Sequence, residues 1–258
     1  MKTVILCGGM GMRLKEETEY KPKPLVEIGG RPILWHIMKI YAYYGYNDFI
    51  LCLGYKGQKI KEYFLNYEAM NNDFTIKLGN PNKITYHGSH DETDWSVTLV
   101  DTGLETMTGA RVKKIEKYIQ EDEFMLSYGD GVAKINIKNL VNFHFSHKKI
   151  GTVTGVHPQS RFGKLIVNEN KVKDFSEKPL SSNEYINGGF FVFNRKIFEY
   201  LSPSEDCYLE RDPLENLAKD NELMMYPLDN YWQCMDTYRD MQLLNEVWEK
   251  GKAEWKVW

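Results

Sequence analysis

The sequence has no long hydrophobic run and little cysteine. None of its apolar stretches approaches the roughly 20 residues that a membrane-spanning helix needs. The opening stretch, residues 1–7, is too short for the core of about 7–15 apolar residues found in a signal peptide. Four cysteines lie far apart and form no C-x-x-C pair: Cys7, Cys52, Cys207 and Cys234. We therefore expect a cytoplasmic chain that binds no membrane. We also expect its thiols to be reduced, and those of Cys7 and Cys52, which lie in apolar runs, to be buried.

Neither sign of charge is in excess. The chain has 33 basic and 36 acidic side chains, a net charge of −3, and a sequence pI near 6.1. A nucleic-acid-binding domain usually has a pI above about 9, so the composition argues against that class. A few well-placed cations would still be enough to bind an anionic small molecule. Internal repeats and low-complexity linkers are also missing, and we predict a single domain over residues 1–258.

Strand-like apolar runs alternate with segments of helical spacing from the N-terminus onward. The predicted strands are residues 3–7, 49–53, 97–100, 124–128, 151–156 and 188–193. The predicted helices are residues 32–44, 60–67, 108–120, 137–148 and 237–250. We also predict a β-hairpin around residues 168–170 and a loop or short hairpin over residues 79–94. Such alternation indicates βαβ units, and hence an α/β fold with a mostly parallel sheet flanked by helices and a smaller sheet-rich lobe near the carboxyl end.

A glycine-rich segment, residues 6–14, directly follows the first predicted strand. The dinucleotide-binding pattern G-x-G-x-x-G fails because Leu14 stands at its last position, and the P-loop pattern fails because Arg13 stands where a glycine is required. What remains is G-G-x-G-x-R, followed ten residues later by Lys23. A tight turn without a ligand is one interpretation of the glycines. A triphosphate-binding site is the other interpretation. It is favoured because two cations, Arg13 and Lys23, accompany backbone amides that glycine leaves accessible.

Two aspartates occupy positions suited to a metal ion. Asp130 comes just after the predicted strand 124–128, and Asp236 stands where a strand gives way to the last helix. Mg²⁺ is usually held by one or two carboxylates together with substrate phosphates. Each aspartate also has an alternative to metal binding that stays open at this point: Asp130 as a turn residue, and Asp236 as the N-cap of a helix. His144 and His147 have no third ligand near them in the sequence, and we predict that they are surface side chains.

These motifs resemble those of the sugar-1-phosphate nucleotidyltransferases, and the resemblance runs along the whole chain. It rests on residues 8–14 and 23–28. The family has a Rossmann-like core and joins an NTP to a sugar 1-phosphate. Four further segments resemble the members that use CTP and glucose 1-phosphate to make CDP-glucose: residues 21–24, 32–39, 107–111 and 248–253. Use of UTP or dTTP in place of CTP, with the same chemistry, remains an alternative. One residue departs from the family pattern: Met12 stands where the family usually has Thr or Ser.

The resemblance implies a role for each motif. The nucleotide-binding residues would be Leu6, Cys7, Gly8, Gly9, Met10, Gly11, Met12, Arg13, Lys23, Thr106, Gly109, Arg111 and Gly129. The sugar-phosphate-binding residues would be Glu177, Lys178, Asn187, Gly188 and Gly189. Arg13, Lys23 and Lys178 would be catalytic, and Asp130 and Asp236 would bind Mg²⁺. Residues 1–135 would form the nucleotide-binding half, and residues 136–258 the sugar-phosphate half with the C-terminal helix.

The resemblance also implies a homo-oligomer, a hexamer by analogy with the family, that serves deoxysugar synthesis for lipopolysaccharide O-antigen. Two rival functions differ in class. A non-catalytic sugar-nucleotide-binding subunit would be expected to lack Arg13, Lys23 or one of the two acidic metal ligands. This sequence has all of them. A glycosyltransferase would usually show a D-x-D motif after a central strand, but Val132 occupies the second acidic position.

Overall fold

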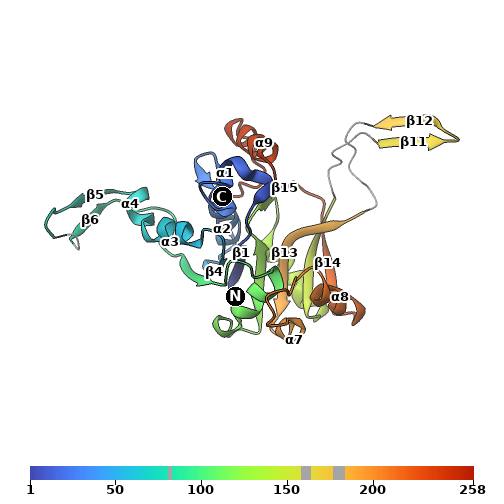
Figure 1. The fold of residues 1–258 in the computed structure, drawn as a ribbon, viewed down its shortest axis with the longest axis horizontal. Coiled ribbons are helices and arrows are strands. Elements are labelled where there is room, and N and C mark those ends of the chain that lie inside the picture. The colour runs from blue at the N-terminus through green and yellow to red at the C-terminus, as the bar shows by residue number, and fades with distance from the viewer. Residues whose placement is uncertain (81–82, 158–163, 177–183) are drawn as a thin grey trace.

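A seven-stranded sheet forms the centre of the molecule (Figure 1). The computed structural model describes residues 1–80, 83–157, 164–176 and 184–258. From edge to edge the strands are β14 (Leu223–Leu228), β10 (Gly151–Val156), β13 (Ile186–Asn194), β8 (Glu123–Tyr128), β1 (Thr3–Cys7), β4 (Asp48–Leu53) and β7 (Ser96–Asp101). Neighbouring strands of this sheet are parallel, except that β13 runs antiparallel to β8 and β10. The predicted α/β fold with a mostly parallel sheet is confirmed.

Helices cover both faces of the sheet, because successive strand residues point to opposite sides and both sides are apolar. In β1, Ile5 and Cys7 belong to one buried cluster, and Val4 and Leu6 belong to the other. The first cluster is completed by α2 (Ile33–Tyr43), α3 (Gly57–Leu65), α6 (Ile137–His147) and α9 (Tyr238–Glu249). The second is completed by α5 (Thr108–Lys114), α7 (Ile197–Tyr200) and α8 (Asp212–Lys219). Two short helices lie outside these sets, α1 (Lys15–Thr18) and α4 (Tyr67–Asn71).

Among the residues that the structure describes, four small antiparallel pairs accompany the central sheet. They are β2 (Glu27–Ile28) with β3 (Arg31–Pro32), β5 (Asp73–Ile76) with β6 (Ile84–His87), β9 (Gly131–Ala133) with β15 (Trp232–Cys234), and β11 (Lys164–Asn168) with β12 (Lys171–Ser176). The hairpin predicted around residues 168–170 is confirmed, since Glu169 and Asn170 both have positive φ, as a two-residue hairpin turn requires. The hairpins β5–β6 and β11–β12 extend away from the central sheet at opposite ends of the molecule (Figure 1).

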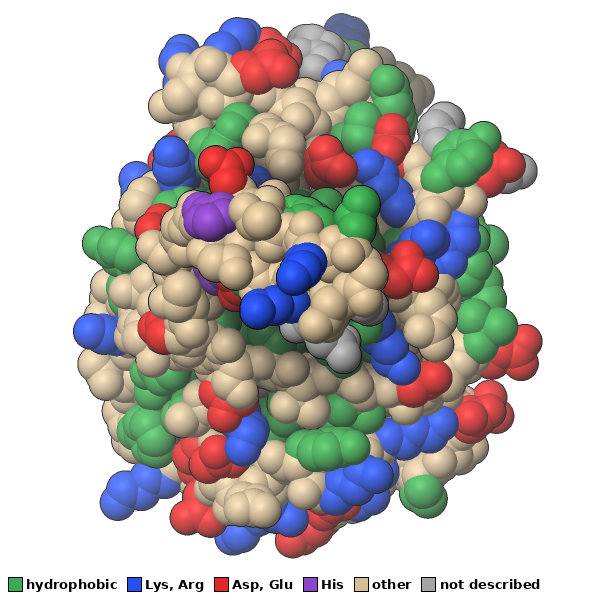
Figure 2. Space-filling model, turned by 90° about the vertical axis from the view of Figure 1, so that its left-hand side faces the viewer, with side chains coloured by type: hydrophobic (Ala, Val, Ile, Leu, Met, Phe, Trp, Pro, Cys, Tyr) green, Lys and Arg blue, Asp and Glu red, His purple; other side chains and the backbone are tan. Residues whose placement is uncertain are grey.

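The strands of the second half of the chain do not form a separate large sheet. β10, β13 and β14 extend the central sheet, and β11–β12 pair only with each other among the residues that the structure describes. On the face that Figure 2 presents, basic and acidic side chains are interspersed, in keeping with the balanced composition. In the described part of the chain, no helix combines the length and the apolar character that crossing a membrane requires. All four cysteines are free thiols, and Cys7 and Cys52 are buried.

Two sequence predictions are wrong in detail. The helix predicted over residues 108–120 ends at Lys114, and a 3-10 turn follows at Glu116–Tyr118. His144 is 2% exposed rather than at the surface. Its ring contacts the carboxylate of Glu123 through Nε2 (2.9 Å) and the hydroxyl of Thr152 through Nδ1 (2.8 Å). The ring can be buried because each of its nitrogens has a polar partner, one on β8 and one on β10.

The C-terminal segment packs against α2 through aromatic rings. The Trp255 side chain is fully buried, and its Nε1 donates to Nδ1 of His36 (3.3 Å). Nε2 of His36 therefore carries the proton and donates to the carbonyl oxygen of Ile28 (2.8 Å). Trp248 meets the same imidazole edge-on, with the ring centroids 4.8 Å apart. Burial lowers the pKa of His36 from 6.5 to about 4, so this ring is neutral when the tail is docked.

This burial predicts a pH dependence of stability. Between pH 6.5 and about 4 the unfolded chain binds a proton at His36 that the folded chain does not, so the free energy of unfolding falls as the pH drops through that window. We expect His36→Gln, which cannot titrate, to remove on the order of 3 kcal/mol of that fall. Urea unfolding of both proteins at several pH values measures it. Equal slopes in the two proteins would contradict the prediction.

Candidate active site

The glycine-rich loop after β1 is anchored by a buried arginine. The guanidinium of Arg111, which is 4% exposed, donates to the carbonyl oxygens of Gly8 (3.2 Å), Leu53 (3.0 Å) and Leu104 (3.2 Å). A Cβ on Gly8 would lie 2.1 Å from Cζ of Arg111. Glycine is therefore required at this position, because only a bare backbone leaves room for the guanidinium. Arg111 ties the loop to the end of β4 and to the segment before α5.

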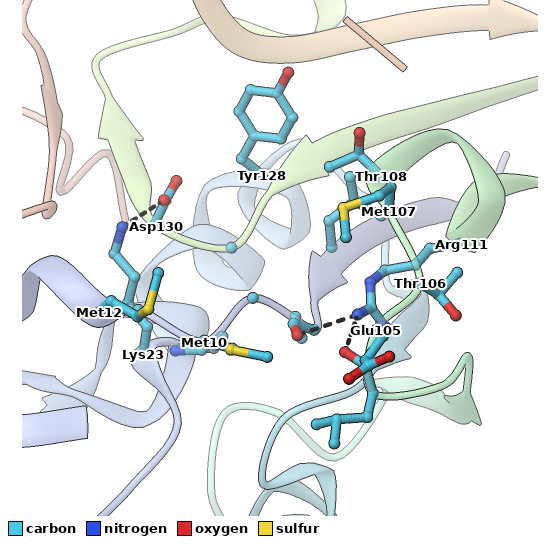
Figure 3. Close-up of a pocket in the computed structure, with 18 of the residues that line it drawn as sticks. Met10, Met12, Lys23, Glu105, Thr106, Met107, Thr108, Arg111, Tyr128 and Asp130 are labelled. Atoms are coloured by element: carbon cyan, nitrogen blue, oxygen red, sulfur yellow. Dashed lines mark hydrogen bonds and ion pairs between the residues drawn. The ribbon is translucent and has the colours of Figure 1, made fainter. Parts of the chain in front are cut away.

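A cavity of about 680 Å³ opens beside this loop (Figure 3). Its lining includes these predicted residues: Leu6, Cys7, Gly8, Gly9, Met10, Gly11, Met12, Lys23, Thr106, Arg111, Gly129 and Asp130. In Figure 3, Lys23 and Asp130 lie at one end of the cavity, and Thr106 and Arg111 lie at the other. The cavity lies at the carboxyl ends of β1 and β8, where open α/β sheets bind their ligands.

Lys23 joins two carboxylates at the charged end of the cavity. Its Nζ donates to Oδ2 of Asp130 and to Oδ1 of Asp236, both at 2.7 Å, and its side chain is only 12% exposed. Burial alone would lower the pKa of Lys23, but the two carboxylates outweigh burial and raise it. Arg13, 70% exposed, forms a second ion pair with Oδ2 of Asp236 (3.1 Å). The cluster holds two cations and two anions within one small volume.

Strand pairing brings the two aspartates together from distant parts of the sequence. Asp130 precedes β9, and Asp236 follows β15, the strand that pairs with β9. The amide of Met235 donates to the carbonyl oxygen of Asp130 (2.8 Å), which continues that pairing by one step. The N-cap of α9 is Thr237, in a capping box with Asp240. The interpretation of Asp236 as an N-cap is therefore wrong, and its carboxylate contacts the cations instead.

The two carboxylates fit a Mg²⁺ site. Both already face one cation, the ammonium of Lys23, and carboxylate oxygens are ligands that Mg²⁺ prefers. Within the described residues, no cluster of three or more His, Cys, Asp and Glu side chains could hold a metal ion. An ion here would thus take one or two protein carboxylates and complete its shell with phosphate and water oxygens, as Mg²⁺ commonly does.

A second, smaller cavity of about 230 Å³ adjoins the first. The two share Tyr128 and Asp130 in their linings. The smaller cavity is also lined by Arg13, Gly188, Gly189 and Asp236. Two adjacent cavities with the charged cluster between them suit a reaction between two bound anions.

Some predicted residues are not part of either lining. Gly109 packs against another segment, because a Cβ there would lie 2.7 Å from Sγ of Cys207. Asn187 lies next to the smaller cavity and donates through Nδ2 to the hydroxyl oxygen of Tyr128 (2.9 Å). Glu177 and Lys178 lie outside the residues that the structure describes.

The structure adds residues that the sequence analysis did not single out. The larger cavity is also lined by Pro24, Leu104, Glu105, Met107, Thr108, Tyr128 and Asp206, and the smaller one by Ser127, Gly131, Phe190, Trp232 and Cys234. Tyr128 ends a central strand directly before Gly129 and Asp130, a position that points to a ligand contact. Asp206 carries no such signal, because it reaches the cavity only through the tertiary fold.

Known proteins are similar to this chain in sequence and in fold. The nucleotidyl transferase family model matches residues 2–245. Glucose-1-phosphate cytidylyltransferase of Salmonella typhimurium is 49% identical over 259 residues, which cover 100% of both chains. D-glycero-alpha-D-manno-heptose 1-phosphate guanylyltransferase of Aneurinibacillus thermoaerophilus is 29% identical and covers 94% of this chain and 97% of its own. The structure of HddC from Yersinia pseudotuberculosis complexed with GMP-PN has a TM-score of 0.68 at 23% identity, covers 96% of this chain and 99% of its own, and so shows the fold.

The fit between Gly8 and Arg111 can be tested by adding a methyl group. In Gly8→Ala the new Cβ would lie 2.1 Å from Cζ of Arg111 and must displace the guanidinium, so we expect the free energy of unfolding to fall by about 1–3 kcal/mol. Gly9→Ala is the matched control, because a Cβ there meets no atom within 4 Å. Urea unfolding measures both. An equal effect of the two substitutions would contradict the anchoring role of Arg111.

Proposed function

The chain belongs to the nucleotidyl transferase family, and we propose that it transfers the cytidylyl group of CTP to glucose 1-phosphate, giving CDP-glucose and pyrophosphate. The observation that carries this proposal is the position of Lys23 between Asp130 and Asp236, where two cavities meet. The Salmonella relative, 49% identical over its full length, supports the choice of CTP and glucose 1-phosphate.

The proposed step is an in-line displacement at the α-phosphorus of CTP. A phosphate oxygen of glucose 1-phosphate forms the new bond to this phosphorus, the bond to the α–β bridging oxygen breaks, and pyrophosphate leaves with that electron pair. The attacking oxygen is already an anion, so the chain has no need of a strong base. Catalysis of this kind consists mainly of positioning and of stabilising negative charge.

The cations of the cluster would perform that stabilisation. Lys23 stays charged because the carboxylates raise its pKa, and its ammonium would neutralise the α-phosphate. Arg13 reaches from the solvent side and would hold the β- and γ-phosphates. Asp130 and Asp236 would hold Mg²⁺, which would supply positive charge to offset the negative charge of the phosphates.

The two cavities suggest a division of labour between substrates. The larger cavity, with the glycine-rich loop, would take CTP, so that residues 1–135 form the nucleotide-binding half. The smaller cavity, lined by Gly188 and Gly189, would take the sugar, with Asn187, Glu177 and Lys178 as further sugar-phosphate contacts from residues 136–258. The cytoplasmic location, the assembly into a homo-oligomer and the supply of deoxysugars for O-antigen belong to the same proposal.

Substrate use gives the direct test. We expect the purified protein with Mg²⁺ and glucose 1-phosphate to release pyrophosphate with CTP at a rate at least tenfold above that with UTP, dTTP or ATP, because nucleotide bases are distinguished by a few hydrogen bonds. A coupled pyrophosphate assay measures it. Preference for another NTP would overturn the base assignment, and no release with any pair of substrates would favour the non-catalytic sugar-nucleotide-binding subunit.

The cluster itself is tested by substitution. We expect Lys23→Ala and Asp236→Asn each to lower turnover by about 10²–10³-fold, the usual effect of losing one preorganised charge contact. Lys21→Ala is the matched control, because the Lys21 ammonium pairs with Glu17 and Glu27 rather than with the cluster. Thermal unfolding checks that each variant is folded. Turnover near the wild-type value in a folded Lys23→Ala protein would refute the role of this lysine.

A further inference from the structure

Glu210 joins two elements of the candidate active site although it comes from neither. It lies just before α8, and its carboxylate accepts two short hydrogen bonds. Oε1 accepts from the hydroxyl of Tyr128 (2.6 Å), at the end of β8, and Oε2 accepts from the hydroxyl of Thr108 (2.6 Å), at the start of α5. Hydrogen bonds to a carboxylate are among the stronger ones in proteins. Glu210 therefore links a wall shared by both cavities to a wall of the larger one.

The bond to Glu210 determines how Tyr128 uses its hydroxyl group. A tyrosine hydroxyl has one hydrogen, so once it donates to Glu210 it can only accept from other groups. Nδ2 of Asn187 donates to it (2.9 Å).

The same arrangement fixes the side-chain amide of Asn187. Its Nδ2 faces Tyr128, and its Oδ1 accepts from the backbone amide of Gly189 (2.9 Å). If Tyr128 lost its acceptor, its hydroxyl could donate toward Asn187 and favour the flipped amide. The flipped amide would place its NH₂ group against the N–H of Gly189, two donors facing each other. Glu210 thus determines, through one tyrosine, which way the amide of Asn187 points.

The ring of Tyr128 is held by packing as well. A Cβ on Gly189, where φ is +82°, would lie 2.7 Å from Cδ2 of Tyr128, so the ring lies directly on this glycine. Phe191 meets the ring edge-on, with centroids 5.6 Å apart. The position of the hydroxyl oxygen is therefore set by β13, and the direction of its hydrogen is set by Glu210.

We propose that Glu210 is a positioning residue that sets selectivity for the sugar of the sugar 1-phosphate. The bonds described above leave one N–H of Asn187 and one lone pair of Tyr128 for a ligand. Together these offer a donor and an acceptor to neighbouring hydroxyl groups of the sugar. A site built to match donors and acceptors rejects an epimer that presents its hydroxyl groups differently. This inference rests on the proposed function, because it assigns the smaller cavity to the sugar.

Two substitutions and their combination test the chain of hydrogen bonds. In Glu210→Ala we expect KM for glucose 1-phosphate to rise about tenfold, which corresponds to about 1.4 kcal/mol, while KM for CTP stays within about twofold. The rate ratio of glucose 1-phosphate to galactose 1-phosphate should fall by a similar factor. Tyr128→Phe keeps the ring but removes the hydroxyl, and it should reproduce both effects. The double variant should lose no more than Tyr128→Phe alone, because Glu210 acts through the hydroxyl that this substitution removes.

Two controls separate this path from general damage. Glu215→Ala removes a carboxylate from α8 that pairs with Lys219, and it should behave as the wild type. Glu210→Gln, which can still accept from Tyr128, should recover most of the sugar selectivity. Loss of activity in Glu210→Ala without a change in sugar KM or selectivity would show a merely structural role and overturn the proposal.

Calorimetric titration with glucose 1-phosphate keeps this inference separate from the proposed function. If the wild type releases no pyrophosphate, the proposed function fails, but weaker binding of glucose 1-phosphate to Glu210→Ala than to the wild type still supports the positioning role. If the wild type turns over CTP and glucose 1-phosphate while Glu210→Ala retains its KM, affinity and selectivity, the positioning role alone is refuted.

Discussion

The ion cluster around Lys23 is the interaction on which the rest of the site depends. A partly buried ammonium between two carboxylates depends on both partners, since removing one member of a buried ion pair leaves a desolvated charge that is less well compensated. The three groups come from a turn after the first strand, from the end of β8 and from the segment after β15. The pairing of β9 with β15 therefore serves the site directly, because it brings Asp130 and Asp236 to the same ammonium.

Arg111 imposes the second constraint, and it acts on the backbone rather than on a charge. Its guanidinium binds carbonyl oxygens from the glycine-rich loop, from β4 and from the segment before α5. These bonds hold the wall of the larger cavity in one shape and require a glycine at position 8. The resemblance to known nucleotidyltransferases assigned Arg111 to the nucleotide, and the structure adds its role in joining the segments that surround the nucleotide cavity.

The sequence predicted regular elements well where the apolar pattern was continuous. β1 and β10 have the predicted bounds, and α2 ends before Gly45 as expected. The pattern failed for the helix predicted over residues 108–120, where apolar spacing continues through a 3-10 turn that places Ile119 in the core without α-helical geometry. It also failed for His144 in α6, because burial of a histidine depends on polar partners, and here these are Glu123 on β8 and Thr152 on β10.

The sequence by itself determined the fold class, the glycine-rich loop and the identity of the charged residues, because strand and helix periodicity and local motifs are written in neighbouring positions. Only the tertiary structure decided that Lys23, Asp130 and Asp236 meet at one point and that Tyr128 forms a wall of two cavities. It also decided that Glu210 reaches both Tyr128 and Thr108. These contacts join residues between 82 and 213 positions apart, and their geometry follows from strand order and pairing, which no local pattern encodes.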